Sequence, residues 1–304
     1  MADYTPSGNQ YEISRGHQHA VVVEVGGGVR EYRVGTRNVL DPYPVDAMCD
    51  GAHGAPLIPW PNRLADGKYS FDGNDYQVAL TEPKSATAIH GFLRWRNWSV
   101  VAHEQSRVVM GHVLRPLQGY PFSLDVRVAY ELDDDGLRVT TSATNTGVTD
   151  APWACGAHPY LSPGEGLIDS ASLLFTAGLR IATDERQLPK ADVPVAGTDY
   201  DFSTPRPIGP LKIDFAFKEV ARDEAGRARV RLTGFDGRCA ELWCDASYRL
   251  VELYTGDTLA PNRQRHGLGV EPMSAPPNAF ATGHGVIRLA PGESTVHVWG
   301  ARLV

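Results

Sequence analysis

The sequence predicts an all-β protein, and three observations support this class. Apolar and polar residues alternate with a period of two in many short segments, which is the pattern of half-buried strands. No window of about a dozen residues keeps a helical apolar stripe free of glycine and proline. The 31 glycines and 22 prolines suit many turns between short strands.

The clearest strand pair is expected over residues 123–130 and 137–142. Every second residue from Leu124 to Tyr130 is apolar, while Asp125 and Arg127 fall on the opposite face. The run Asp133-Asp134-Asp135-Gly136 has the composition of a hairpin turn. Residues 123–142 therefore predict an antiparallel hairpin with one buried face.

Further strands are expected before and after this hairpin. Period-two runs occupy residues 20–25, 229–232, 250–254 and 295–299. Gly26-Gly27-Gly28 follows the first of these runs, but it lacks GxGxxG spacing and opens no helical pattern, which disfavours a nucleotide-binding βαβ unit. There is no low-complexity linker, composition shift or fixed-period repeat, so a single domain over residues 1–304 is expected.

Charge and hydropathy exclude several classes of partner. The formal net charge is -7 and no basic cluster could follow a phosphate backbone, so a nucleic-acid partner is not expected. No segment approaches the roughly 18 apolar residues of a membrane span. The first residues, MADYTPSGNQYEIS, have neither a basic nor an apolar leader region, and a cytoplasmic protein is expected.

The four cysteines form no CxxC pair. Cys49 precedes His53, and Cys155 precedes His158, at spacings that a metal could use, but two isolated pairs are weak evidence for zinc. Reduced thiols are expected in a cytoplasmic protein.

Five segments place an ionisable residue among glycine, proline and aromatic neighbours, which suits the mouth of a cleft. An arginine after a stiff turn can bind hydroxyls, a histidine can exchange protons near neutral pH, and a carboxyl group that loses water becomes a better base. Each segment alone fits a structural role equally well: a surface arginine, a core histidine or a turn glutamate. The five residues are Arg63, His90, His158, Asp214 and Glu271.

Taken in order, these segments resemble the signature segments of the aldose 1-epimerase (galactose mutarotase-like) family. The resemblance rests on Asn62-Arg63, His90-Gly91-Phe92, His158-Pro159-Tyr160-Leu161, Asp214, and Glu271-Pro272 with Pro276-Pro277-Asn278-Ala279-Phe280. It extends from about Tyr11 to Val304. The string Leu57-Ile58-Pro59-Trp60-Pro61-Asn62-Arg63 is similar to a bacterial branch distinct from the standard galactose enzyme.

The resemblance implies a large antiparallel β-sandwich with an open cleft on one sheet. It assigns Glu271 as the general base at the C1 hydroxyl and His158 as the general acid at the ring oxygen. His90 would hydrogen-bond near the ring oxygen, while Arg63 and Asp214 would hold sugar hydroxyls. Asp214 matches less closely, because Phe215 follows it where the family usually has a polar residue.

The chemistry that this family carries out needs two proton-transfer groups and neither a metal nor a redox cofactor. One proton leaves O1 while another reaches the ring oxygen, so a carboxylate and an imidazolium on opposite sides of the hemiacetal would suffice. Aromatic side chains would stack on the sugar ring, and Trp243 and Tyr160 are candidates together with Trp60, Trp153 and Phe280. The expected partner is a monosaccharide, and the chain is expected to be a monomer or homodimer.

Three alternatives remain open. A mutarotase of an anionic sugar, a hexose 6-phosphate or a sulfo-sugar, would add cationic contacts from Arg63, Lys84, Arg94 or Arg96. A non-catalytic carbohydrate-binding sandwich would need no acid–base pair. A cupin-like metal enzyme is disfavoured because the chain lacks an HxH motif followed closely by glutamate.

Overall fold

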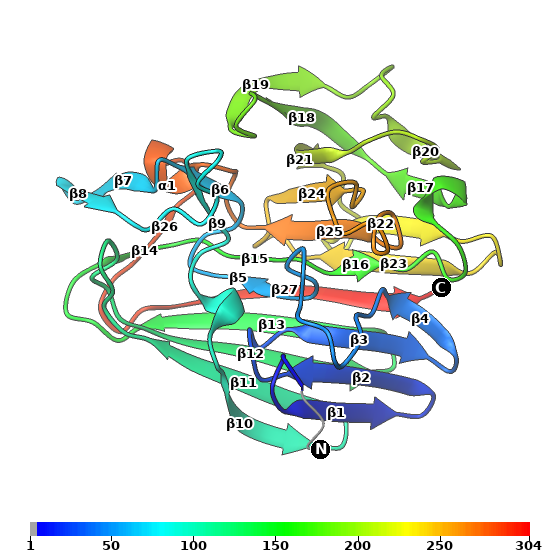
Figure 1. Cartoon of the computed structure of the whole chain (residues 1–304), viewed down its shortest axis with the longest axis horizontal. Helices are drawn as coiled ribbons and strands as arrows, with labels where there is room; N and C mark the ends of the chain where they lie inside the picture. The colour runs from blue at the N-terminus through cyan, green and yellow to red at the C-terminus, as the bar shows by residue number, and fades with distance from the viewer. Residues whose placement is uncertain (1–4) are drawn as a thin grey trace.

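Strands dominate the computed structural model, which describes residues 5–304 (Figure 1). Residues 1–4, the start of the segment from which the cytoplasmic location is expected, lie outside the described part. Helical structure within residues 5–304 is limited to a short α-helix, α1 (Ala279–Thr282), and two 3-10 turns, η1 (Leu93–Trp95) and η2 (Ile168–Ser170). The predicted all-β class is confirmed.

Two large antiparallel sheets form the body of the protein. The first, here called the cleft sheet, has 12 strands. Its main path runs in the order β1 (Gln10–Arg15), β2 (Gln18–Val23), β3 (Val29–Val34), β4 (Arg37–Leu40), β16 (Tyr160–Leu161), β25 (Leu268–Met273), β24 (Leu250–Tyr254), β21 (Asp214–Val220), β18 (Ala177–Thr183) and β19 (Pro189–Pro194). Off this path, β15 (Gly156–Ala157) pairs with β25 and with β5 (Pro56–Leu57).

The second sheet, here called the back sheet, has nine strands. Its order is β10 (Ser99–Glu104), β11 (Arg107–Leu114), β12 (Leu124–Asp133), β13 (Gly136–Asn145), β27 (Ser294–Leu303), β23 (Cys239–Cys244), β22 (Ala228–Thr233), β17 (Ser172–Phe175) and β20 (Phe202–Pro207). Three two-stranded ribbons complete the fold: β14 (Ala151–Trp153) with β26 (Ile287–Leu289), β6 (Arg63–Ala65) with β9 (Thr87–Ile89), and β7 (Lys68–Phe71) with β8 (Asn74–Gln77).

The predicted hairpin is present as β12 and β13, paired from Leu124 opposite Asn145 to Asp133 opposite Gly136. Its alternation is visible in burial, because Leu124, Val126, Val128 and Tyr130 are buried while the residues between them are not. The strand expected over 20–25 instead begins at Gln18 and ends at Val23. It ends early because Gly26 and Gly27 adopt positive φ, which a strand cannot accommodate.

The hydrophobic core lies between the two sheets, which form the predicted sandwich. Strand β4 of the cleft sheet packs against β23 and β27 of the back sheet, and Trp153, Trp299 and Tyr32 are among the largest fully buried side chains. His297, expected to be structural, is buried on β27 and accepts a hydrogen bond from the Trp153 indole N–H at 3.3 Å. All four cysteines are free thiols. No helix among the described residues is long and apolar enough to cross a membrane.

Candidate active site

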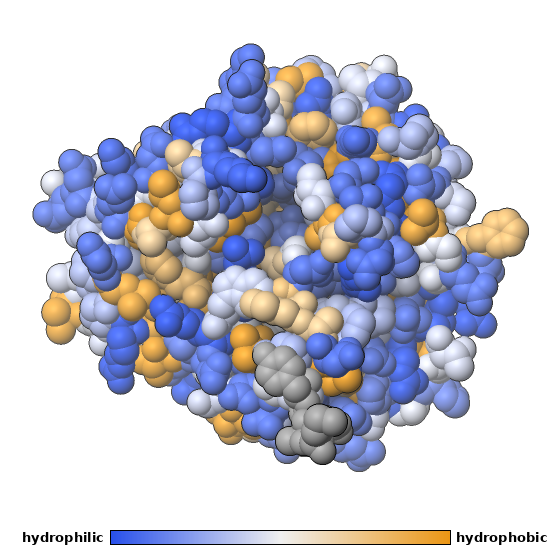
Figure 2. Space-filling view, in the orientation of Figure 1, coloured by the Kyte–Doolittle hydropathy of each residue, from blue (hydrophilic) through white to orange (hydrophobic). Residues whose placement is uncertain are grey.

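Three neighbouring strands of the cleft sheet each place a carboxyl group on one face. Glu252 on β24 pairs directly with Glu271 on β25. Glu252 also pairs with Ala216 on β21, so Asp214, two residues before Ala216, projects to the same face. Directly paired residues of antiparallel strands project to the same face. All three carboxyl groups line a cleft that is also bordered by the β6–β9 ribbon. Figure 2 shows a hollow near the centre of this face.

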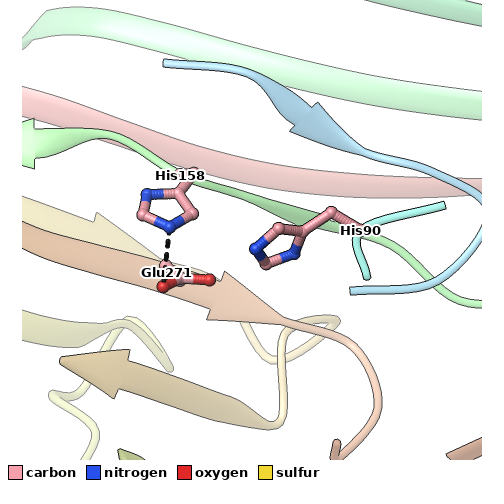
Figure 3. Close-up of side chains that lie close together, drawn as sticks. All are labelled: His90, His158 and Glu271. Carbon is pink, nitrogen blue, oxygen red and sulfur yellow. Dashed lines mark ion pairs between the residues drawn. The ribbon is translucent and has the colours of Figure 1, made fainter. Parts of the chain in front are cut away.

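The predicted acid and base are in contact at the floor of this cleft. His158 Nε2 lies 3.0 Å from Glu271 Oε1, and both side chains are almost completely buried (Figure 3). The two groups were expected on opposite sides of a hemiacetal, and the structure instead places them side by side. O1 and the ring oxygen of an aldose are both bonded to C1, so adjacent groups can address both oxygens from one side.

Backbone contacts and an aromatic ring fix the position of His158. Its N–H donates to the Ala55 carbonyl at 3.0 Å, and its carbonyl accepts from the Gly54 N–H at 2.9 Å. The Tyr160 ring stacks on the imidazole with centroids 5.0 Å apart, and the Tyr160 hydroxyl donates to the Gly51 carbonyl at 2.7 Å. The structure therefore places Tyr160 behind His158, with its hydroxyl already used, and not as a platform for a sugar.

His90 projects from the turn after β9 towards the same pair (Figure 3). The Asn62 backbone N–H donates to His90 Nδ1 at 3.0 Å. Because a backbone N–H can only donate, Nδ1 must be the acceptor nitrogen and Nε2 must carry the proton of the neutral ring. His90 reaches this position because Gly91 has φ +65°, and a Cβ there would overlap the Ile58 carbonyl oxygen.

The same geometry bears on metal binding. His90, His158 and Glu271 each offer a ligand atom, and these atoms all lie within 4.8 Å of one another. A metal ligand needs a free lone pair on the nitrogen, whereas Nε2 of neutral His90 carries a proton while Nδ1 is occupied by Asn62. The local hydrogen bonds therefore favour His90 as a donor to an oxygen atom over His90 as a metal ligand.

Arg63 lines the cleft from β6 and is held from both sides. Its guanidinium forms a two-point contact with Glu82, with Nε at 2.9 Å and Nη2 at 3.2 Å from the carboxylate oxygens. The flanking backbone is clamped by Asn278, whose N–H donates to the Arg63 carbonyl and whose Oδ1 accepts from the Ala65 N–H. The Pro276-Pro277-Asn278 segment therefore holds the strand that carries Arg63.

Two residues that line the cleft, Glu252 and Tyr254, are not among the site residues expected from the sequence. Glu252 is buried, and its Oε2 accepts from Asn62 Nδ2 at 2.8 Å. It is the one charged residue in the apolar strand Leu-Val-Glu-Leu-Tyr, a signal visible in the sequence. Tyr254, two residues later on the same face, also lines the cleft. Neither residue was assigned to the site, because the sequence of a strand does not reveal which strands lie beside it.

The prediction that Trp243 contacts the sugar is wrong. It lies on β23 of the back sheet, where its ring packs against Gly300 and is flanked by the guanidinium groups of Arg227 at 4.1 Å and Arg138 at 5.6 Å. Trp60 and Phe280 pack against each other in the core with centroids 5.4 Å apart.

Burial dominates the electrostatics of the site. It raises the pKa of Glu271 well above its ordinary value, and the nearby Asp214 charge raises it further. Burial also lowers the pKa of His158 to about 3, and the Arg94 charge acts in the same direction. The pKa of His90 falls for the same reason. These shifts favour an uncharged pair in the resting site, with one proton between Nε2 and Oε1, whereas an imidazolium and a carboxylate were expected.

Comparisons with known proteins identify the family of the chain. Residues 9–300 match the model of the aldose 1-epimerase family. The chain is 35% identical over 291 residues to the uncharacterized protein YihR of Escherichia coli strain K12, covering 94% of this chain and 91% of that protein. It is 28% identical over 214 residues to the galactose mutarotase of Homo sapiens, covering 64% of this chain and 56% of that protein.

Solved structures share the fold at low sequence identity. A putative aldose 1-epimerase from Escherichia coli K12 superposes with a TM-score of 0.83 at 23% identity, covering 97% of this chain and 99% of that one. The galactose 1-epimerase of Lactobacillus acidophilus superposes with a TM-score of 0.81 at 17% identity, covering 97% and 98%. Together with the family model, which spans nearly the whole sequence, these findings show that the chain belongs to the aldose 1-epimerase family.

Proposed function

We propose that the protein interconverts the α and β anomers of an aldose, with Glu271 as general base and His158 as general acid, and that it needs no cofactor. The observation that carries the proposal is the buried contact between His158 Nε2 and Glu271 Oε1 at 3.0 Å, on the floor of an open polar cleft. A buried carboxyl and imidazole that are in contact and border a cleft can exchange protons with a bound substrate.

The proton shared by the pair can serve both roles. If it moves fully to His158, Glu271 becomes the carboxylate that accepts the O1 proton. The O1 lone pair then forms the C1 carbonyl while the C1–ring-oxygen bond breaks, and the ring oxygen takes the proton from His158. Rotation about C1–C2 and the reverse transfers give the other anomer, and the enzyme regains its starting protonation.

The surrounding residues would bind the sugar. His90 Nε2–H is a donor beside the pair, with its ring centroid 5.4 Å from that of His158, and would approach the ring oxygen or a neighbouring hydroxyl. Arg63 and Asp214 line the cleft and would hold further hydroxyls. Tyr254 is the aromatic residue of the cleft lining and would contact the ring face.

Polarimetry on freshly dissolved α-glucose and α-galactose tests this function. Glu271→Gln and His158→Asn should each lower kcat by about 10²-fold or more, because general acid–base catalysis contributes on this scale. Glu131→Gln is the matched control, since Glu131 lies on the exposed face of β12. Wild-type rates in both site variants would refute the assignment. Retention on immobilised polysaccharide without mutarotation would favour a binding module instead.

A second candidate keeps the reaction and changes the sugar to one with an anionic group. Arg94 lines the cleft, and no carboxylate among residues 5–304 lies within 4.0 Å of its guanidinium, whereas Arg63 is paired with Glu82. Lys84 and Arg96, the other cations considered, are exposed and lie outside the cleft lining. A hexose 6-phosphate or sulfo-sugar that competes with glucose in wild type but not in Arg94→Met would support this candidate.

A further inference from the structure

Glu252 is a buried carboxyl group of the cleft to which the proposed reaction assigns no step. Only 3% of the residue is exposed, and no arginine, lysine or histidine nitrogen of the described chain lies within 4.0 Å of its oxygens. Its neighbours on the same face are two more carboxyl groups, Glu271 and Asp214. A buried charge without a cation is strongly unfavourable, so this arrangement requires an explanation.

The contacts of Glu252 indicate how it is accommodated. Its Oε2 accepts a hydrogen bond from Asn62 Nδ2 at 2.8 Å. Asp214 lies on the same face of the neighbouring strand, two residues before the Ala216 that pairs with Glu252, where the two carboxyl groups are close enough to interact. Two ionised carboxylates are both acceptors only, so they cannot hydrogen-bond to each other unless one of them carries a proton. Glu252, the more buried of the two, is the better site for that proton.

Asn62 connects Glu252 to the substrate-facing residues. Asn62 has φ +55°, a left-handed conformation that is uncommon outside glycine and that asparagine tolerates better than most residues. Its Nδ2 is bound to Glu252, its Oδ1 accepts from the Arg63 N–H at 2.7 Å, and its backbone N–H donates to His90 Nδ1. Loss of the Glu252 contact would therefore release the group that fixes which nitrogen of His90 is protonated.

We propose that Glu252 is a positioning residue that works as a neutral carboxylic acid, donating to Asp214 and accepting from Asn62. In this role it keeps Asp214 ionised as an acceptor and holds His90 as an Nε2–H donor, so that acceptor and donor face the cleft together. The inference rests on the proposed function, because the purpose of this order is to bind an aldose against the His158–Glu271 pair.

Glu252→Gln and Glu252→Leu separate this role from a charged or catalytic one. The amide of glutamine can donate to Asp214 and accept from Asn62, so it reproduces both hydrogen bonds, whereas leucine keeps the volume and removes both. We expect Glu252→Leu to lower kcat/KM by about 10- to 100-fold, and glutamine to recover most of that loss. Glu271→Gln, the same chemical change on the paired strand, should show no such recovery.

Two measurements on the folded protein test the proposal without relying on turnover. The protonated-carboxyl region of the infrared spectrum of the wild type at pH 7 should contain a component that disappears in Glu252→Gln and remains in Glu271→Gln. Nitrogen-15 spectra should show His90 as the Nε2–H tautomer in wild type and Glu252→Gln, and as a mixture in Glu252→Leu. Circular dichroism and thermal melting identify variants that fail to fold.

Each outcome has a distinct meaning. Glutamine and leucine variants with equal losses, or an unchanged carboxyl band in Glu252→Gln, would overturn the role of Glu252. A wild-type protein that shows the band and the tautomer but no mutarotation would leave the hydrogen-bond network intact and refute the proposed function instead. The tautomer therefore distinguishes positioning from catalysis, since a merely space-filling residue would not change it.

Discussion

Substitutions of Asn278 separate two properties of this residue that support the strand of Arg63: its tolerance of positive φ and its side-chain hydrogen bond to Ala65. Asn278 adopts φ +64°, and its Oδ1 accepts from the Ala65 N–H at 3.0 Å. Alanine in a left-handed conformation costs about 1–2 kcal/mol. An amide N–H left without its partner costs about 1–3 kcal/mol. Asn278→Ala should therefore lower the free energy of unfolding by about 2–5 kcal/mol.

Two matched variants divide this loss. Glycine accepts the positive φ but has no side-chain acceptor, so Asn278→Gly should lose only the hydrogen-bond part, about 1–3 kcal/mol. Aspartate keeps both the acceptor oxygen and a tolerance for positive φ, so Asn278→Asp should remain within about 1 kcal/mol of wild type. Urea unfolding followed by tryptophan fluorescence gives these free energies.

The same variants should change sugar binding in proportion to the freedom of Arg63. We expect KM to rise in the alanine and glycine variants, with kcat changed less, because Glu271 lies on β25 and His158 lies between β15 and β16, away from the strand of Arg63. Polarimetry at several sugar concentrations measures both constants. The reasoning is refuted if the aspartate variant is as unstable as the alanine variant, or if the glycine variant retains the full stability of the wild type.

Three further predictions concern packing and protonation. Gly91→Ala should reduce kcat and stability more than Gly73→Ala. Both glycines have positive φ, but only a Cβ added at Gly91 would overlap another atom. Equal melting temperatures of the two variants would contradict this prediction. Trp243→Leu should lower stability by about 1–4 kcal/mol yet leave KM unchanged, which polarimetry checks. Because burial lowers the pKa of His158 to about 3, the unfolded chain binds a proton between pH 3 and 6.5 that the native state does not. The wild type should therefore lose about 3 kcal/mol of stability relative to His158→Gln from pH 7 to pH 4, and a constant difference in urea titrations would argue against it.

Sequence reasoning succeeded where a local pattern determines structure. The alternation from Leu124 to Tyr130 predicts a strand with one buried face because side chains of a strand alternate between the two faces. The end of β2 was harder to predict because backbone hydrogen bonds compete there with the turn that Gly26 begins. Whether the chain is one domain stays a prediction.

The candidate site was predictable only as a set of separate residues. The resemblance named Arg63, His90, His158, Asp214 and Glu271, and all five line one cleft. Their mutual geometry was not predictable, because it depends on which strands are neighbours. The contact of His158 with Glu271 requires both β15 and β16 to pair with β25. His158 and Glu271 are more than a hundred positions apart in the sequence. Trp243 was assigned wrongly for the same reason.

Two buried glutamates show how far a strand pattern can be interpreted. Glu241 on β23 and Glu271 on β25 both interrupt apolar segments and are both buried. Burial would raise the pKa of Glu241, but hydrogen bonds and charges from Arg231, Arg229 and Arg302 outweigh it and bring the pKa below its ordinary value. Glu241 is therefore an ion-paired structural residue, with Arg231 Nε at 2.6 Å and Arg302 Nε at 2.9 Å.

Glu271 has the opposite surroundings, and this difference distinguishes a proton-transfer group from a structural one. Its closest contact is an imidazole and its same-face neighbours are two carboxyl groups, so burial outweighs the opposing charge of Arg63 and its pKa rises. The raised pKa favours the protonated form of the carboxyl group, which can release its proton when a ligand supplies new hydrogen bonds. The residues on the neighbouring strands decide whether the pKa of a buried glutamate is raised or lowered. Arginines from β22 and β27 form ion pairs with Glu241, whereas no arginine among residues 5–304 forms an ion pair with Glu271. Placing an arginine beside Glu271 would therefore stabilise its carboxylate and remove the base from the pH range in which it can exchange protons.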